Sequence, residues 1–233
     1  MLDGLLQALC LPASWRQEHH LAHLARRPNG RGLHCRSAAF HLASADIIAT
    51  HPAKEARMIH HRALVHAKAH VDANTVQIGA GTKVWQFASV TRGTVLGDDC
   101  SVSPHAMLDG SIYGDRVIIS GGVMAGAGFK VGNDVFLGPN VVLCNDAWPA
   151  VDKDGYDDER LRSKEWFTVT IGNGATIGAG AVILPGNRIY PDAVVAAGAI
   201  VNRNVPSGMV FCRGGSIKPK PEDWRENRMR WVS

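Results

Sequence analysis

The chain has 233 residues, of which 45% are hydrophobic and 20% charged, so one globular domain accounts for it and a second large domain is not needed. Its formal charge of +4 forms no basic stripe with interleaved aromatic residues, which argues against a nucleic-acid-binding protein and suits a phosphorylated small ligand. Five scattered cysteines without CxxC spacing, and no stretch near the ~20 apolar residues of a membrane span, predict a soluble protein of the reducing cytoplasm.

Residues 1–57 follow no regular period. The segments LDGLLQALC and HHLAHLARR are candidates for helices, whereas NGRGLHCRSAAFHLASAD is basic, rich in alanine and aperiodic. We therefore expect an N-terminal extension that is poorly ordered or partly helical. Its role stays open, as does the alternative that Met58 is the natural start of the protein.

Residues 58–206 carry an aliphatic side chain at every sixth position, and the residue four places later is mostly small. Neither an α-helix nor a flat strand has this period. The clearest run is Ile171, Ile177, Ile183, Ile189, Val195 and Val201. Upstream, the pattern covers Val65 and Val71, shifts by one residue, and continues through Ile78, Val84, Val90, Leu96, Val102 and Leu108. A one-residue deletion then resets it to Tyr113, Ile119, Ala125, Val131, Leu137 and Leu143.

A six-residue period predicts an all-β parallel β-helix, in which each repeat is one short strand plus a turn. Three repeats make one triangular coil, and successive coils stack about 4.8 Å apart. We expect six or seven coils with flat outer faces that favour three-fold packing. The 25 glycines and the low aromatic content of 6% agree with such a turn-rich scaffold.

Two segments depart from the repeat. Residues 146–170 are polar and irregular, which predicts a loop that protrudes from the coils. Residues 207–233 contain KPKP followed by EDWRENRMRWVS, and we expect a C-terminal cap with a short helix that closes the open end of the stack.

Several segments resemble known proteins. MIHHRALVHAKAHVD, from Met58, is similar to the usual opening of hexapeptide-repeat sugar acyltransferases. VWQFASVTRGTVLGDDCSVSPHAMLDGSIYGDRV, VGNDVFLGPNVVLCNDAWP and TIGNGATIGAGAVILPG resemble nucleotide-sugar N-acetyltransferases that acetylate 3-amino sugars for O-antigen and S-layer glycans. The resemblance covers residues 58 to about 206. It departs from the family at Ser120, Gly121 and Gly122, where some relatives have polar amides, and at a shortened LDGS segment.

This resemblance implies a left-handed parallel β-helix and a homotrimer. It also implies a transferase that moves an acetyl group from acetyl-CoA to the amino group of a nucleotide-linked amino sugar, in lipopolysaccharide or other surface polysaccharide biosynthesis. No metal, nucleic acid or membrane is implied as a partner. The nucleotide, the sugar and the length of the acyl chain stay open.

Acyl transfer to an amine benefits from a base within hydrogen-bonding reach. Ten of the 11 histidines lie at or before His70, so His105 is the only histidine within the central coils and the first candidate for the catalytic base. The resemblance adds Asp109, which would orient the imidazole or bind the sugar, and Asp146, which would hold the acceptor amine. The alternatives are that His105 is an ordinary corner residue and that both aspartates only form turns.

The remaining candidate residues would bind substrate and cofactor. The candidates for binding the nucleotide sugar are the aromatic and amide residues Trp85, Gln86, Phe87, Asn145 and Trp148. The alternative role of the aromatic rings is packing between subunits. For the pantetheine arm of coenzyme A the candidates are the small residues Gly178, Ala179, Gly180 and Ala197, with Ala196 and Gly198 beside them. For its 3′-phosphate they are the cations Arg203, Lys218 and Lys220, with Arg213 also available.

Other functions remain as alternatives. An O-acetyltransferase acting on a sugar hydroxyl shares the scaffold, but its activating histidine normally lies where this chain has Asn145 and Asp146. A non-catalytic β-helix scaffold is also possible. A zinc carbonic anhydrase is disfavoured, because its three-histidine site cannot be built from a chain with no histidine after His105.

Overall fold

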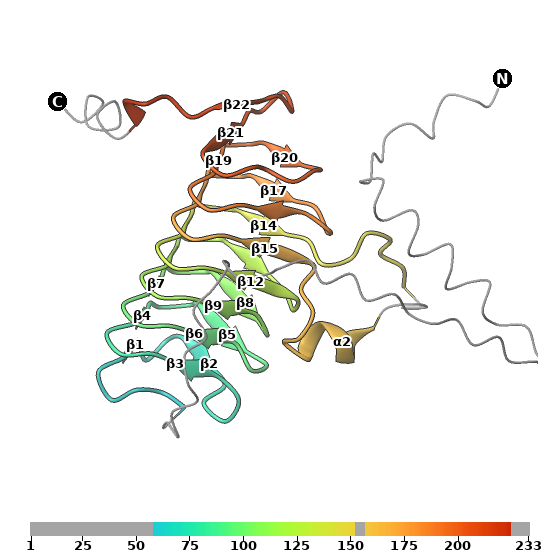
Figure 1. Cartoon of the computed structure of the whole chain (residues 1–233). Helices are drawn as coiled ribbons and strands as arrows, with labels where there is room; N and C mark the ends of the chain where they lie inside the picture. Colours follow the sequence, from blue (N-terminus) through green and yellow to red (C-terminus); the bar gives the residue numbers. More distant parts are fainter. Residues whose placement is uncertain (1–57, 152–156, 225–233) are drawn as a thin grey trace, which may run out of the picture. The chain divides into compact units, whose positions relative to one another are not determined.

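The computed structural model of the protein describes residues 58–151 and 157–224. They form a left-handed parallel β-helix whose three sheets are the faces of a triangular prism (Figure 1). The candidate helices within residues 1–57, and nearly all of the expected C-terminal helix, lie outside the described residues, so those expectations stay predictions.

Each face of the prism is one sheet of short strands, one strand per coil. The first face contains β1 (Leu64–Val65), β4 (Lys83–Val84), β7 (Ser101–Val102), β10 (Ile118–Ile119), β13 (Phe136–Leu137), β16 (Thr176–Ile177), β19 (Val194–Val195), β21 (Met209–Phe211) and β22 (Ile217–Pro219). The second face contains β2 (His70–Val71), β5 (Ser89–Thr91), β8 (Met107–Asp109), β11 (Met124–Ala125), β14 (Val142–Leu143), β17 (Val182–Ile183) and β20 (Ile200–Val201). The third face contains β3 (Gln77–Ile78), β6 (Val95–Leu96), β9 (Ile112–Tyr113), β12 (Phe129–Val131), β15 (Val169–Ile171) and β18 (Arg188–Ile189).

The aliphatic residues of the six-residue period form the core. Every one of them from Ile78 to Val201 is buried, and the smaller residues four places later, such as Ala175 and Ala181, are buried beside them. The period is therefore confirmed as the inward-facing column of the prism. Tyr113 occupies one of these inward positions, and burial raises the pKa of its hydroxyl well above the ordinary value.

Most coils contain 18 residues, and the exceptions explain the breaks in the period. Asp98 and Asp115, which are hydrogen-bonded in adjacent coils, are only 17 residues apart. The turn that is one residue shorter contains Gly110, which has a φ of 88°. The one large insertion lies between β14 and β15, so that Asn133 and its neighbour in the next coil, Asn173, are separated by 40 residues.

One corner of the prism, between the third and first faces, is stabilised by a ladder of side-chain oxygens. In each coil a carboxylate or amide oxygen accepts the backbone N–H of the coil before it: Asp98 from Ala80 at 2.7 Å, Asp115 from Asp98 at 2.9 Å, Asn133 from Asp115 at 2.9 Å and Asn173 from Asn133 at 2.9 Å. The residue before each of these four ladder side chains is a glycine, and a Cβ there would collide with the next coil. At Gly97, for example, the added Cβ would lie 2.3 Å from the Asp115 carboxylate. The GD and GN pairs in the sequence are therefore required by coil stacking.

The C-terminal end of the stack differs from the simple cap expected. Strand β22 pairs with β21 in antiparallel fashion, with Val210 opposite Lys218. A hairpin thus covers the last parallel strand of the first face, and its turn contains Gly214 and Gly215, the latter with a φ of 81°. A glycine pair between two short apolar segments is a hairpin signal that is independent of the six-residue period.

The ladder can be tested at Asn133. Replacing it by alanine removes the acceptor for the Asp115 N–H, so we expect Asn133→Ala to lower the free energy of unfolding by about 1–2 kcal/mol. Asn74→Ala, at an exposed turn residue, is the matched control and should change it by less than about 0.5 kcal/mol. Denaturant unfolding at equal protein concentration measures both; equal values for the two variants would mean that the ladder contributes no net stability.

Candidate active site

The turns between the first and second faces form the His105 corner, defined by residues 85–88, 103–106, 120–123, 138–141, 178–181 and 196–199 of successive coils. Backbone hydrogen bonds stack these turns: the Asn140 N–H donates to Gly121, that of Gly180 to Pro139, and that of Gly198 to Ala179. Trp85–Phe87, His105 and the small residues from Gly178 to Ala197 thus lie along one edge of the prism, although they are far apart in the chain.

His105 is exposed at this corner and packs against an aromatic ring. The Phe87 ring lies in the preceding coil, nearly parallel to the imidazole at 18°, with the ring centroids 5.3 Å apart. Phe87 and His105 both have left-handed backbone conformations, with φ values of 61° and 63°. The same turn position is also left-handed in later coils, at Gly122, Asn140, Gly180 and Gly198. A bulky residue in this region is uncommon and costs on the order of 1 kcal/mol or more.

The predicted coenzyme A track lies further along the same corner. Here the glycines have two different roles. A Cβ on Gly178 would lie 2.4 Å from the Ala197 nitrogen, so this glycine is required for the coils to stack. A Cβ on Gly180 would meet nothing within 4 Å, and Ala179, Gly180 and Ala197 are exposed. A slender thiol-bearing arm could therefore lie along these turns beside backbone amides.

The cations predicted for the 3′-phosphate are not gathered on this track. The Arg203 guanidinium donates to the Gly215 carbonyl, and the Lys220 ammonium donates to the Asp192 carbonyl at 3.0 Å, on the ladder corner. Lys218 lies on β22 and is exposed. Arg213 is the cation that the structure places on the His105 corner, because its Nε donates to the Ala197 carbonyl at 3.2 Å.

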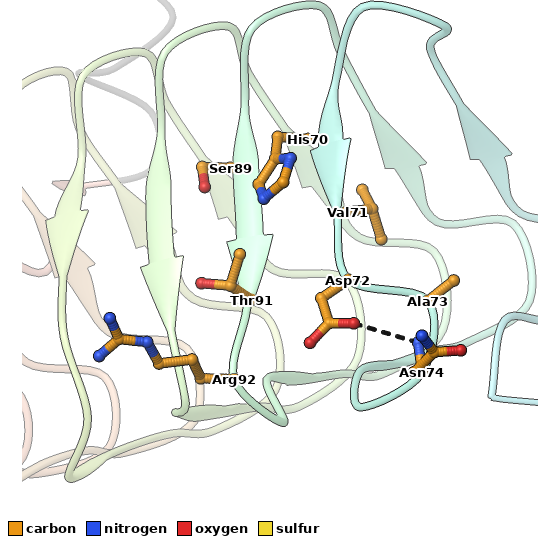
Figure 2. Close-up of a pocket in the computed structure, with 8 residues that line it drawn as sticks. All are labelled: His70, Val71, Asp72, Ala73, Asn74, Ser89, Thr91 and Arg92. Atoms are coloured by element: carbon orange, nitrogen blue, oxygen red, sulfur yellow. Dashed lines mark hydrogen bonds between the residues drawn. The ribbon is translucent and has the colours of Figure 1, made fainter.

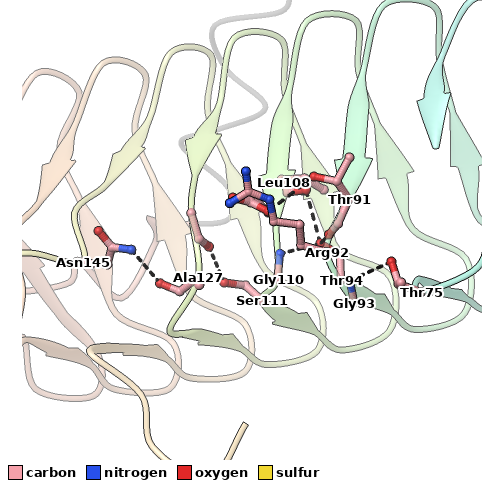
Figure 3. Close-up of polar contacts among 12 residues, drawn as sticks. Thr75, Thr91, Arg92, Gly93, Thr94, Leu108, Gly110, Ser111, Ala127 and Asn145 are labelled. Atoms are coloured by element: carbon pink, nitrogen blue, oxygen red, sulfur yellow. Dashed lines mark hydrogen bonds and ion pairs between the residues drawn. The ribbon is translucent and has the colours of Figure 1, made fainter. Parts of the chain in front are cut away.

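The turns between the second and third faces form a separate polar region, the Asp109 corner, defined by residues 72–76, 92–94, 109–111, 126–128, 144–151 and 157–168. Asp109 accepts a hydrogen bond from the Thr91 hydroxyl at 3.3 Å and pairs with Arg92 at 3.3 Å. Figure 3 shows the contacts that continue along this corner, among them the Asn145 side-chain N–H on the Ala127 carbonyl at 3.1 Å. The backbone of this corner is thus fixed by hydroxyl and amide side chains.

Asp146 and Trp148 begin the long insertion at this corner. The Asp146 carboxylate accepts the Trp148 N–H at 2.9 Å, which is the Asx turn considered as its alternative role. Asp146 is half-buried, and the Trp148 side chain is 58% exposed. The insertion therefore starts in a defined turn that presents an indole ring.

The second half of the insertion folds back onto the coils. Helix α2 (Asp158–Arg162) is capped by the Asp157 carboxylate, and its Leu161 is buried against Gly128, where a Cβ would collide. The Lys164 ammonium donates to the Gly93 carbonyl at 2.6 Å, three coils before the insertion, and partial burial lowers the pKa of Lys164. The insertion was expected to protrude, but its described C-terminal part packs along the Asp109 corner.

An open hollow lies on the second face near the N-terminal coils (Figure 2). Two strands contribute the outward side chains of His70 and Ser89, and the Asp109 corner contributes polar turn residues. The lining consists of His70, Val71, Asp72, Ala73, Asn74, Ser89, Thr91 and Arg92. The Asp72 carboxylate accepts the Thr75 hydroxyl at 2.5 Å and so stabilises its own turn.

Asp109 is the last residue of strand β8, whereas His105 lies in the turn before that strand. The Asp109 carboxylate contacts Arg92 and Thr91 on the Asp109 corner. A role of Asp109 in orienting the imidazole stays a prediction. The predicted residues fall into two groups, one on each corner, and the second face separates them.

Metal-ligand groups, membrane helices and activated thiols were sought among the described residues. No group of three His, Cys, Asp or Glu side chains in that part of the chain could hold a metal ion. None of its helices is long and apolar enough to cross a bilayer. Burial raises the pKa of the Cys100 and Cys144 thiols, so neither is activated as a nucleophile that would carry the acyl group.

Comparison with known proteins gives partial matches. No protein-family model matches the sequence. The chain is 34% identical over 81 residues to the galactoside O-acetyltransferase of Escherichia coli, which covers 34% of this chain and 37% of that protein. It is 28% identical over 144 residues to the bifunctional protein GlmU of Acetivibrio thermocellus, covering 61% of this chain and 27% of that protein. The chain spans about half or less of the length of the curated relatives that it matches.

Solved structures with a similar arrangement include two sugar acyltransferases. The UDP-N-acetylglucosamine acyltransferase of Francisella novicida gives a TM-score of 0.47 at 15% identity, covering 74% of this chain and 73% of that one. PerB of Caulobacter crescentus, solved with CoA and GDP-perosamine, gives a TM-score of 0.33 at 20% identity, covering 69% of this chain and 56% of that one.

The strained backbone at His105 leads to a stability prediction. His105→Gly and His105→Ala both remove the ring, but only glycine relieves the left-handed conformation, so we expect the glycine variant to be more stable by roughly 0.5–1 kcal/mol. Ser103, in the same turn without a positive φ, is the control position, where glycine should be no more stable than alanine. Thermal and denaturant unfolding of the four variants measures this; the same order at both positions would refute strain at His105.

Proposed function

We propose that this chain is a hexapeptide-repeat acyltransferase that transfers an acetyl group from acetyl-CoA to the amino group of a nucleotide-linked amino sugar. The observation that carries the proposal is the shared corner of His105 and the small, exposed turns at Gly180 and Ala197. A thioester lying along those turns would bring its carbonyl towards the imidazole. The partial matches to acetyltransferases support the reaction class.

The chemistry follows from a base beside a bound thioester. The acceptor amine attacks the thioester carbonyl carbon, and the His105 imidazole accepts the proton that the nitrogen loses. The resulting oxyanion collapses, the carbon–sulfur bond breaks, and the coenzyme A thiolate leaves. The proton held on His105 can then pass to that thiolate, so that the products are an amide and free coenzyme A. Direct transfer agrees with the raised pKa values of Cys100 and Cys144.

A trimer would complete the site. Large apolar side chains are exposed on the two faces that flank the His105 corner: Leu64, Ile118 and Phe136 on the first, and Met107, Met124 and Ile200 on the second. Such surfaces favour packing against further copies of the chain. We propose that a neighbouring subunit presents its Asp109 corner to the His105 corner. Asn145, Asp146 and Trp148 of one chain would then contact the acceptor beside His105 of another.

The nucleotide part of the acceptor would use the remaining residues of the first coils. Trp85 is 37% exposed, and Gln86 lies beside it in the same turn of the His105 corner. An indole face and an amide suit a nucleobase, the first by stacking and the second by hydrogen bonding. Acetylation of a sugar hydroxyl is the second candidate reaction, which the match to the galactoside O-acetyltransferase favours.

The reaction is tested by release of free thiol from acetyl-CoA with a panel of UDP- and dTDP-linked 3-amino and 4-amino sugars and the matching hydroxyl sugars. We expect turnover with an amino sugar, and His105→Ala should lower kcat by about 10²–10⁴-fold while coenzyme A still binds. His61→Ala, an exposed histidine near the start of the coils, is the matched control. Near-normal turnover by His105→Ala would make this residue structural, and turnover only with hydroxyl sugars would establish the second candidate.

The cofactor track is tested by steric blocking. Ala197 is exposed and has no positive φ, so Ala197→Trp should fold normally and yet obstruct the corner. We expect its dissociation constant for coenzyme A to rise by at least about 10-fold, the change that corresponds to losing 1.4 kcal/mol of binding free energy. Ala73→Trp, at an exposed turn of the Asp109 corner, is the control. Calorimetric titration that finds equal affinity in both variants would place the cofactor elsewhere.

A further inference from the structure

We infer that Phe87 is a positioning residue for His105 and does not serve as a stacking platform for a nucleobase. The inference rests on the proposed function, because it concerns how the base of that reaction is held. It assigns Phe87 a role other than the substrate contact predicted from the sequence.

The geometry of the two rings supports this role. Phe87 and His105 occupy the same turn position in successive coils, and their rings are stacked at 5.3 Å between centroids and 18° between planes. The Lys68 ammonium lies 5.8 Å from the Phe87 ring centroid. Lys68, from the coil before, thus also contacts the Phe87 ring, and one face of that ring is occupied by the imidazole.

The backbone at this turn position aligns the two side chains. Phe87 and His105 both adopt left-handed φ values, as do Gly122, Asn140, Gly180 and Gly198 at the same turn of later coils. The repeated left-handed turn therefore places the Phe87 and His105 rings one above the other in adjacent coils, where they are stacked.

Stacking restricts the imidazole in a way that matters for catalysis. An exposed histidine side chain rotates about its second torsion through a broad range. A nearly parallel ring limits that rotation, because steeply tilted imidazole orientations would move towards the Phe87 ring. A base that is aimed correctly contributes to kcat, whereas it contributes little to the binding of coenzyme A further along the corner.

The test is a double-mutant cycle with a rescue variant. We expect Phe87→Leu to lower kcat by about 10- to 100-fold with the KM for acetyl-CoA unchanged, and Phe87→Tyr, which keeps the ring, to restore it. In the His105→Ala background, Phe87→Leu should have no further effect, because the group that it positions is gone. An equal loss in both backgrounds, or failure of tyrosine to restore kcat, would overturn the inference.

A second measurement does not depend on turnover. The ring-proton resonances of His105 are identified by NMR as those missing from the spectrum of His105→Ala. Phe87→Leu should shift them, because the ring current is lost, and Phe87→Tyr should leave them nearly in place. If the wild-type chain acetylates nothing in the panel, the proposed function fails, while the NMR result still decides whether Phe87 holds the imidazole. Unshifted resonances in Phe87→Leu would refute the contact itself.

Discussion

The stacking of one coil on the next is the constraint on which the rest of this structure depends. Each two- or three-residue strand is too short to be stable alone, and its backbone groups are satisfied only by the coils above and below. The register therefore admits little variation in coil length. Where the length does change, local devices absorb the change: Gly110 where one residue is missing, and a helix-bearing insertion where 40 residues separate neighbouring positions. The core column and the oxygen ladder both follow from this repeated register.

Stacking also explains why the candidate chemistry lies at the corners of the prism. Strand residues alternate between the core and a flat outer face, and the turns alone bring exposed side chains and backbone groups together at one edge. Left-handed turn positions project side chains of successive coils in line, which is how Phe87 comes to lie against His105. The same alignment lets small residues of later coils form a continuous surface beside them. A linear cofactor would suit such an edge better than it would suit a flat face.

The separation of the two polar corners has a functional consequence. The imidazole and the small-residue turns lie on one corner, whereas Asp109, Arg92 and the start of the insertion lie on another. A single prism cannot fold one corner onto the other, because its faces are rigid sheets. Under the proposed function, the site would thus form between copies of the chain, and the exposed apolar side chains on the two faces that flank the His105 corner are consistent with such packing.

The sequence by itself determined the repeat, the identity of the core residues and the places where the period breaks, because each hexad encodes locally which side chain turns inward. It also singled out His105 and the small residues near Gly180. Only the tertiary structure decided which of these residues are neighbours. His105 lies in the turn before β8, although it is only four residues from Asp109 at the end of that strand, and its ring is stacked on Phe87, 18 residues away. The C-terminal hairpin and the contact of Arg213 with Ala197 likewise have no periodic signal. The physical reason is that the number of residues in each whole coil decides which side chains of neighbouring coils lie next to each other. A local pattern of hydrophobic residues does not contain that information.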